Sequence, residues 1–164
     1  MEQPEFLRTF FTAMSRFIRQ KFLTVMQQDQ YVRSRFRHFH GSTNRGTRIK
    51  WHGTLQPSPR SDIYEVEILY EVPYRPVVKV LTPRLSTWGK LKKQPHTFQD
   101  GSLCVHQAHE WHGNKLVAAT IIPWTCLWLA FYETWLETGC WLGEGTHPDL
   151  PEHSPVSAIP GTML

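Results

Sequence analysis

The segment DGSLCVHQAHEWH, from Asp100 to His112, contains one cysteine, three histidines and two carboxylates. A fourth histidine, His96, lies eight residues before Cys104. An imidazolium close to a thiol lowers the pKa of that thiol and favours the nucleophilic thiolate. Cys104 is therefore a candidate nucleophile, although a cysteine in a histidine-rich chain is more often structural.

The same segment allows a zinc-site interpretation, because Cys104, His106, His109 and His112 are four potential ligands within nine residues. Structural zinc sites usually take their ligands from two separated pairs, however, and the His109–His112 spacing does not match the HExxH helix of metalloproteases. No GxGxxG or phosphate-binding loop is present either. We expect no metal and no cofactor, with zinc binding kept as an alternative.

The bulk properties favour one globular domain of 164 residues that is 13% aromatic. Its three cysteines, Cys104, Cys126 and Cys140, match no disulfide framework, so we expect a reducing, cytoplasmic compartment. The most apolar run, residues 116–132, is short and contains Pro123, which predicts a buried helix and no membrane span.

Hydrophobic periodicity predicts the first elements. Apolar residues at steps of three and four predict an amphipathic helix over residues 5–28. The turn-rich stretch Gly41–Thr47 predicts a loop. Three two-residue alternations follow, which predict strands over 49–55, 64–72 and 77–81. Because the connections between them are short, the strands should form an antiparallel meander.

The segment 82–99 has no clear period, and a short strand or bridge is expected at Leu103–Val105. A helix is predicted over 121–138, with Thr120 as its N-cap and Gly139 just past its end. Two glutamates are expected to point outward, Glu133 and Glu137, and the buried side is expected to comprise Trp124, Leu127, Trp128, Phe131, Trp135 and Leu136. The order predicts an α+β fold, with helices on one antiparallel sheet.

Basic residues are concentrated near the start of the chain. Residues 1–50 hold ten Lys and Arg against three acids, a net charge of +7, and the remainder holds eight against eleven, a net charge of −3. This asymmetry favours an acidic partner for the first helix, or is the charge of a solvated helix face.

The ordered set of motifs resembles the ubiquitin-conjugating (UBC) family. Five segments carry the resemblance: Trp51–Gly53, Tyr64–Tyr70, the proline turn Pro73–Pro76, Asp100–Val105 with its Gly-Ser-Leu-Cys, and Trp111 seven residues after Cys104. The predicted helix after Thr120 resembles the family's crossover helix. The resemblance implies a UBC-like fold over about 5–140, within a single domain of 1–164 whose proline-rich tail is 141–164.

The resemblance implies that Cys104 takes a protein C-terminus as a thioester and passes it to an amine. The family's His-Pro-Asn motif has no asparagine here, and its nearest match is Pro95-His96-Thr97. His96 is the first candidate to support the oxyanion, or it only orients the loop, and His106 is the second candidate for assistance. Asp100, Ser102 and Trp111 are the substrate-side candidates, and Arg16 and Arg19 would contact a partner.

These departures resemble the bacterial relatives found in cyclic-oligonucleotide (CBASS) antiphage operons. Such relatives imply a partner that is the C-terminus of a cGAS-like nucleotidyltransferase or of a ubiquitin-like protein, and a target amine. No specific nucleic acid or membrane partner is expected. Activation would need a separate activating enzyme, or else Cys104 with His96 or His106 would act like a cysteine-hydrolase dyad in reverse. A noncatalytic UBC-like adaptor is the competing interpretation.

Overall fold

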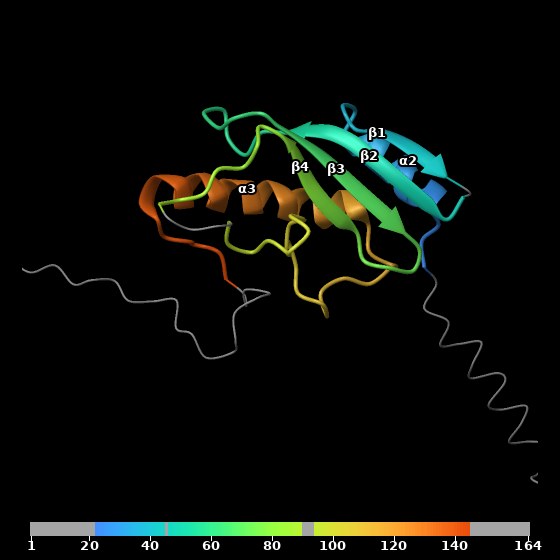
Figure 1. The fold of residues 1–164 in the computed structure, drawn as a ribbon. Coiled ribbons are helices and arrows are strands. Elements are labelled where there is room, and N and C mark those ends of the chain that lie inside the picture. The colour runs from blue at the N-terminus through green and yellow to red at the C-terminus, as the bar shows by residue number, and fades with distance from the viewer. Residues whose placement is uncertain (1–21, 45, 90–93, 145–164) are drawn as a thin grey trace, which may run out of the picture.

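The computed structural model describes residues 22–44, 46–89 and 94–144 (Figure 1). Its elements follow the order α2 (Val25–Arg35), β1 (His40–Asn44), β2 (Arg48–Leu55), β3 (Tyr64–Glu71), β4 (Val77–Thr82), the 3₁₀ turn η1 (Val117–Ala119) and α3 (Ile121–Thr138). The arrangement confirms the predicted α+β fold and is consistent with a UBC-like fold. Figure 1 shows α3 running across one face of the sheet, with α2 near the β1 side.

The sheet is an antiparallel meander in the order β1-β2-β3-β4. Alternate residues of β2 and β3 are buried, so one face of the sheet forms the core and the other meets solvent. Trp51 of β2 pairs with Ile68 of β3, and Ile68 pairs in turn with Val78 of β4. The three predicted strands are confirmed within one or two residues at their ends.

The predicted loop at Gly41–Thr47 is only partly correct. Residues His40–Asn44 form β1, which pairs along its whole length with β2. Four of its five residues are exposed. β1 is an edge strand with the polar sequence HGSTN, so most of its side chains remain in solvent. Without an apolar alternation, this strand gave no periodic signal.

The helix expected over 5–28 is only partly correct in its described part, where residues 25–28 are helical. Residues 22–24 are not helical, and α2 runs from Val25 to Arg35 with Thr24 as its N-cap. Thr24 and Gln27 form a capping box, in which the Thr24 hydroxyl accepts from the Gln27 backbone N–H and the Gln27 side chain accepts from the Thr24 N–H. Residues 5–21 of the predicted helix lie outside the described residues.

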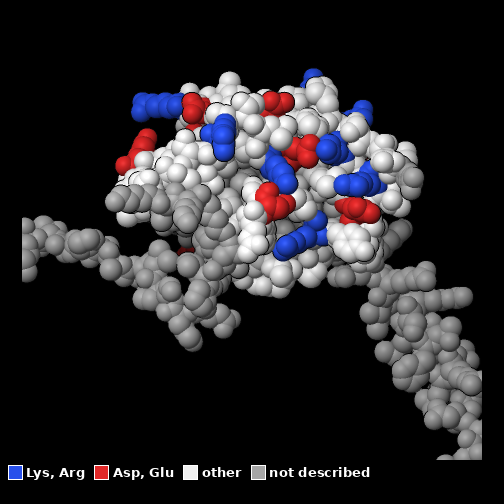
Figure 2. Space-filling view, in the orientation of Figure 1, with Lys and Arg blue, Asp and Glu red and all other residues white. Residues whose placement is uncertain are grey.

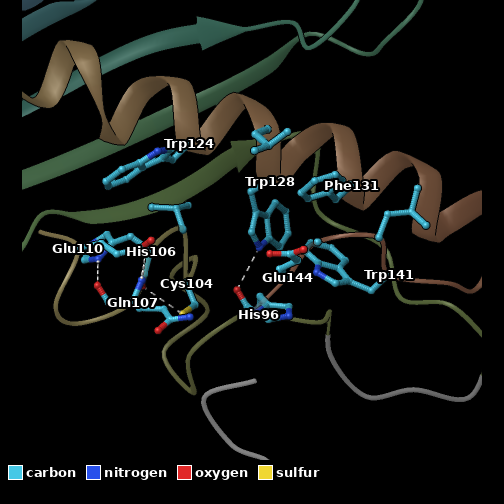
Figure 3. A pocket seen from close by; sticks show the side chains of 14 residues that line it. His96, Cys104, His106, Gln107, Glu110, Trp124, Trp128, Phe131, Trp141 and Glu144 are labelled. Carbon is cyan, nitrogen blue, oxygen red and sulfur yellow. Dashed lines mark hydrogen bonds between the residues drawn. The ribbon is translucent and has the colours of Figure 1, made fainter. Parts of the chain in front are cut away.

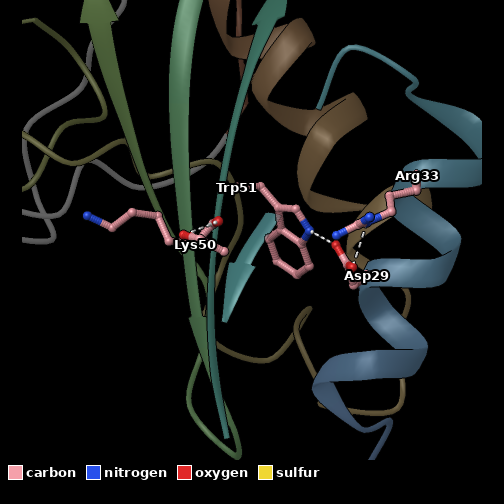
Figure 4. Close-up of polar contacts among 5 residues, drawn as sticks. Asp29, Arg33, Lys50 and Trp51 are labelled. Carbon is pink, nitrogen blue, oxygen red and sulfur yellow. Dashed lines mark hydrogen bonds and ion pairs between the residues drawn. The ribbon is translucent and has the colours of Figure 1, made fainter. Parts of the chain in front are cut away.

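The α2 helix is joined to the sheet through a polar contact inside the interface. The Asp29 carboxylate accepts a hydrogen bond from Trp51 Nε1 at 2.8 Å and forms an ion pair with Arg33 at 2.7 Å (Figure 4). Trp51 is fully buried, so its N–H needs an internal partner. Asp29 supplies that partner and so links α2 to β2.

A second polar contact joins α2 to the segment that precedes α3. Gln28 is fully buried, and its side-chain amide donates to the Lys115 carbonyl at 2.8 Å and accepts from the Val117 N–H at 2.9 Å. One amide therefore satisfies two backbone groups, one just before η1 and one at its first residue. These contacts connect the first described helix to the element that leads into α3.

Replacing Gln28 with alanine is expected to lower the free energy of unfolding by about 2–4 kcal/mol, because two buried backbone groups lose their partner. The measurement is equilibrium urea denaturation. Gln30 lies on the exposed side of the same helix and offers a matched control, Gln30→Ala, which should leave the midpoint nearly unchanged. Equal stabilities of the two variants would contradict a structural role for the Gln28 amide.

The α3 helix is confirmed over Ile121–Thr138, and Gly139 follows it in the left-handed conformation, with φ of 74°. Its buried side differs in part from the prediction. Trp128 and Trp135 are buried as expected, whereas Leu127 is 51% exposed. Thr120 occupies the N-cap position, but its hydroxyl donates to the Leu116 carbonyl and does not cap the helix.

Glu133 was expected to point outward, and this prediction is wrong. Its carboxylate accepts hydrogen bonds from the Ser61 hydroxyl at 2.6 Å, the Asp62 backbone N–H at 3.2 Å and the Tyr64 hydroxyl at 3.0 Å. Burial and the hydrogen bond to Glu133 raise the pKa of Tyr64. Glu133 thus connects the middle of α3 to the loop between β2 and β3.

The outer surface carries both signs of charge. Figure 2 shows Lys and Arg side chains interspersed with Asp and Glu on the face in view. Several are paired, including Lys50 with Glu67 at 2.9 Å and Lys79 with Asp100 at 3.3 Å. Among the described helices, none is long and apolar enough to cross a membrane.

Candidate active site

The cysteine segment is shaped by a small hairpin between His96 and Cys104. The Cys104 N–H donates to the His96 carbonyl at 2.8 Å, the Phe98 N–H donates to the Ser102 carbonyl at 2.8 Å, and Thr97 and Leu103 form an antiparallel bridge. The expected bridge at Leu103 is therefore confirmed. The eight-residue spacing between the histidine and the cysteine places the two residues directly opposite each other.

The tip of this hairpin is fixed by Asp100 and Ser102. The Asp100 carboxylate accepts from the Ser102 hydroxyl at 2.6 Å and from the Ser102 N–H at 3.1 Å, and Gly101 between them has φ of 78°. These Ser102 hydrogen bonds, with a smaller effect from Lys79, lower the pKa of Asp100. Two of the three substrate-side candidates, Asp100 and Ser102, thus hold the loop in shape, and Ser102 itself is buried.

His96 occupies a constrained position at the base of the hairpin. It has φ of 50°, a backbone conformation that non-glycine residues rarely adopt, and its ring stacks on Trp141 with centroids 5.1 Å apart. Its carbonyl accepts a second hydrogen bond, from Trp128 Nε1 at 3.1 Å. A residue of α3 therefore supports the same carbonyl that holds the Cys104 backbone.

Cys104 is half-buried, and its thiol faces the next turn of the loop. The Sγ atom lies 3.8 Å from the His106 carbonyl, to which the thiol donates a weak hydrogen bond. Burial raises the pKa of the Cys104 thiol, Arg75 opposes this increase and Glu110 adds to it. The expected lowering of this pKa by an imidazolium is therefore wrong, because desolvation of the thiolate has the larger effect.

His106 lies two residues after the cysteine, with its ring among aromatic side chains. Its centroid is 5.8 Å from that of Trp124 and 6.4 Å from that of Trp111. Burial lowers the pKa of His106, so the ring is mainly neutral near pH 7, although its bond to Gln107 opposes this effect. Nδ1 lies 2.7 Å from the Gln107 carbonyl oxygen, which can only accept, so Nδ1 carries the hydrogen and the neutral ring keeps a lone pair on Nε2.

An open groove of about 530 Å³ lies between Cys104 and one side of α3 (Figure 3). Its walls come from four separate parts of the chain: His96 at the start of the hairpin, Cys104 with the loop that follows it, one side of α3, and the segment after α3. Aromatic and aliphatic side chains form much of the groove, whose lining residues include Trp124, Leu127, Trp128, Phe131, Trp141 and Leu142. The partial exposure of Leu127 on α3 is explained by this groove. Glu110 and Glu144 also line it, so its fixed charge is negative.

The remaining candidate residues of the loop lie either in the core or on the surface. Trp111 is 6% exposed and packs edge-on against Tyr70 with centroids 5.9 Å apart, so it supports His106 from within the core. His109 and His112 are exposed. Over the described ranges, no group of three His, Cys, Asp or Glu residues is arranged to hold a metal ion. Arg16 and Arg19 lie outside the described residues.

One residue of the site, Arg75, has no motif of its own in the sequence. It lies in the turn between β3 and β4, and its guanidinium carbon is 4.7 Å from the centroid of the Phe98 ring. Arg75 and Phe98 line a small cavity of about 30 Å³ together with Ser102, Cys104 and His106. In the sequence, the proline turn that contains Arg75 only contributes to the family resemblance. Its position beside Cys104 depends on the tertiary fold.

The family comparison gives one match. A model of the family described as the type II CBASS E2 protein matches residues 28–148, a range that includes the sheet, the Cys104 hairpin and α3. No curated protein matches the chain.

Proposed function

The chain belongs to the type II CBASS E2 protein family, and from this premise we propose that it carries a protein C-terminus as a thioester on Cys104 and transfers it to an amine. Family membership implies a function like that of ubiquitin-conjugating enzymes in antiphage defence. The observation that supports the more specific proposal is that the half-buried Cys104 and the imidazole-bearing residue His106, whose pKa is lowered by burial, line the same open groove.

In the loading step, the Cys104 sulfur attacks the carbonyl carbon of an activated C-terminus. Because its thiol is mainly protonated near pH 7, a base must accept the proton first or during attack. The lone pair on His106 Nε2 supplies that base. A new C–S bond forms, the bond from the carbonyl carbon to its previous leaving group breaks, and that group departs with the electron pair.

In the transfer step, a target amine attacks the thioester carbonyl. Before this step, His106 releases the proton that it took during loading to water. The C–N bond then forms, the C–S bond breaks and the Cys104 thiolate leaves, while the proton lost by the amine goes to His106, which can return it to the thiolate. His96 takes the place of the family's asparagine, either by donating a hydrogen bond to the anionic oxygen or by holding the loop in position. Its stacking on Trp141 and its bond to the Cys104 N–H support the second role.

The groove suits an extended C-terminal peptide. Cys104 lines the groove between His106 and His96, and one side of α3 contributes Trp124, Leu127 and Phe131 to its wall (Figure 3). Apolar side chains of a peptide would be removed from water in this groove, which favours binding. The carboxylates of Glu110 and Glu144 would disfavour acidic side chains near the C-terminus of the peptide. A flexible C-terminus that extends from a folded carrier fits this shape.

For partners, we propose that the carrier is a cGAS-like nucleotidyltransferase or a ubiquitin-like protein. A separate enzyme would activate its C-terminus, or Cys104 would attack the C-terminal carboxyl directly, as in the reverse of thioester hydrolysis, with water as the leaving group. The basic segment with Arg16 and Arg19 is the proposed contact for one of these proteins, since its charge favours an acidic surface.

The experiment that tests this proposal is capture of the acyl group on Cys104→Ser in native cells, followed by peptide mass spectrometry. Serine should form an ester that is transferred more slowly than the thioester, so the C-terminal peptide of the carrier is expected to be joined to residue 104. The double variant Cys104→Ser, His106→Ala should accumulate less adduct. Absence of any acyl adduct on position 104 during phage challenge would favour an adaptor function instead.

A further inference from the structure

Arg75 is a cation whose charge acts on the Cys104 thiol, although it comes from a different part of the chain. It follows β3 in the turn Pro73–Pro76, whereas Cys104 follows the hairpin that begins at His96. The two meet because the Leu103 N–H donates to the Val78 carbonyl at 2.9 Å, which attaches the end of the hairpin to β4. Both residues then line the same small cavity.

The guanidinium is held in place by an aromatic ring and not by a carboxylate. It lies over the Phe98 ring at 4.7 Å, a distance at which cation–π attraction is effective. Within the described ranges, no Asp or Glu forms an ion pair with Arg75, whereas Lys79 beside it is paired with Asp100. The positive charge of Arg75 therefore remains available to an anion in the cavity.

The charges that surround Cys104 have different signs. Arg75 approaches from the β3–β4 turn and Glu110 from the loop after the cysteine, while Glu144 lines the groove from the segment after α3. The neutral His106 adds little charge. Without Arg75, a negative charge on sulfur would face only carboxylates from these elements, in a half-buried position where it is poorly solvated.

We propose that Arg75 is an electrostatic residue of the transfer reaction, which stabilises the negative charge that develops at Cys104 when the thiol is deprotonated and when the thiolate leaves. Phe98 is the positioning residue that holds the guanidinium in place. The inference rests on the proposed function for its biological meaning, but it concerns a property of the resting thiol that is measurable without any carrier.

The test is the pH profile of Cys104 alkylation by iodoacetamide, followed at the Cys104 peptide by mass spectrometry. Arg75→Gln is expected to move the profile to higher pH and to slow alkylation below its midpoint by about threefold to tenfold, since tenfold corresponds to one pKa unit. Arg75→Lys keeps the charge and should lie between wild type and Arg75→Gln. The difference should shrink in 1 M salt, where the screening length is about 3 Å.

Arg84→Gln removes the same charge from another exposed residue and is the matched control, for which a wild-type profile is expected. Phe98→Leu should move the profile in the same direction as Arg75→Gln, and it provides a second test if Arg75→Gln folds poorly. Identical profiles for Arg75→Gln and Arg84→Gln would overturn the inference. Failure of the proposed function would appear separately, as a normal Arg75 effect on alkylation with no acyl group ever found on Cys104.

Discussion

The variant Cys104→Ala is expected to lose all reductant-sensitive adduct formation, which makes it the largest effect that we predict. The proposed chemistry passes through a C–S bond at this position, and no other side chain in the groove can replace the sulfur. The measurement is a non-reducing gel of purified protein incubated with extract from phage-challenged cells, compared with the same sample after treatment with dithiothreitol.

The other two thiols provide controls for this result. Cys126 lies in α3, where burial raises its pKa, and Cys140 is exposed just after that helix. Cys126→Ala and Cys140→Ser should each retain the adduct at the wild-type level. If Cys140→Ser abolished the adduct and Cys104→Ala kept it, the nucleophile would have been assigned to the wrong loop.

The variant His106→Ala is expected to slow loading at pH 7 by about 10²–10⁴-fold, the usual range for removal of a general base. The pH dependence identifies the cause. Burial raises the pKa of Cys104 and lowers that of His106, so thiol and neutral imidazole coexist near pH 7 and proton transfer between them is required. As pH rises, the thiol loses its proton to solvent, and the deficit of the variant should shrink.

Below the pKa of His106 the ring is protonated and cannot act as a base, so wild-type loading should also fall on the acidic side. His109→Ala removes an exposed imidazole of the same loop and should leave the rate unchanged. His96→Ala is expected to slow loading without recovery at high pH, because His96 positions the hairpin. Recovery of His96→Ala at high pH, with no recovery of His106→Ala, would exchange the two roles.

Regular elements with one buried face were predictable from the chain alone. The alternation in β3 buries Tyr64, Val66, Ile68 and Tyr70, and the 18-residue α3 ends where Gly139 permits a left-handed conformation. The edge strand β1 was missed because neither of its faces is buried enough to leave a period in the sequence. The start of α2 was misplaced because apolar spacing continues through residues 22–24, where the capping box at Thr24 begins the helix.

The candidate site was only partly predictable, for a different reason. Cys104 and the two histidines were identifiable from residue type and spacing, but the direction of the Cys104 pKa depends on burial by segments distant in sequence. Likewise, Glu133 accepts hydrogen bonds only because the β2–β3 loop lies beside it. Arg75 lies near Cys104 because the hairpin is hydrogen-bonded to β4. Contacts of this kind are set by the tertiary fold and leave no local pattern.

The burial that keeps Cys104 protonated also bears on its survival in an oxidising cell. Peroxide reacts with thiolates far faster than with thiols, so a cysteine with a raised pKa is a poor target for conversion to sulfenic acid. Under the proposed mechanism, the empty site would be chemically quiet, and its sulfur would become reactive when a bound carbonyl and His106 act on it together. Selectivity among the electrophiles of a stressed cell would then come from occupancy of the groove, with no protective disulfide needed at this cysteine.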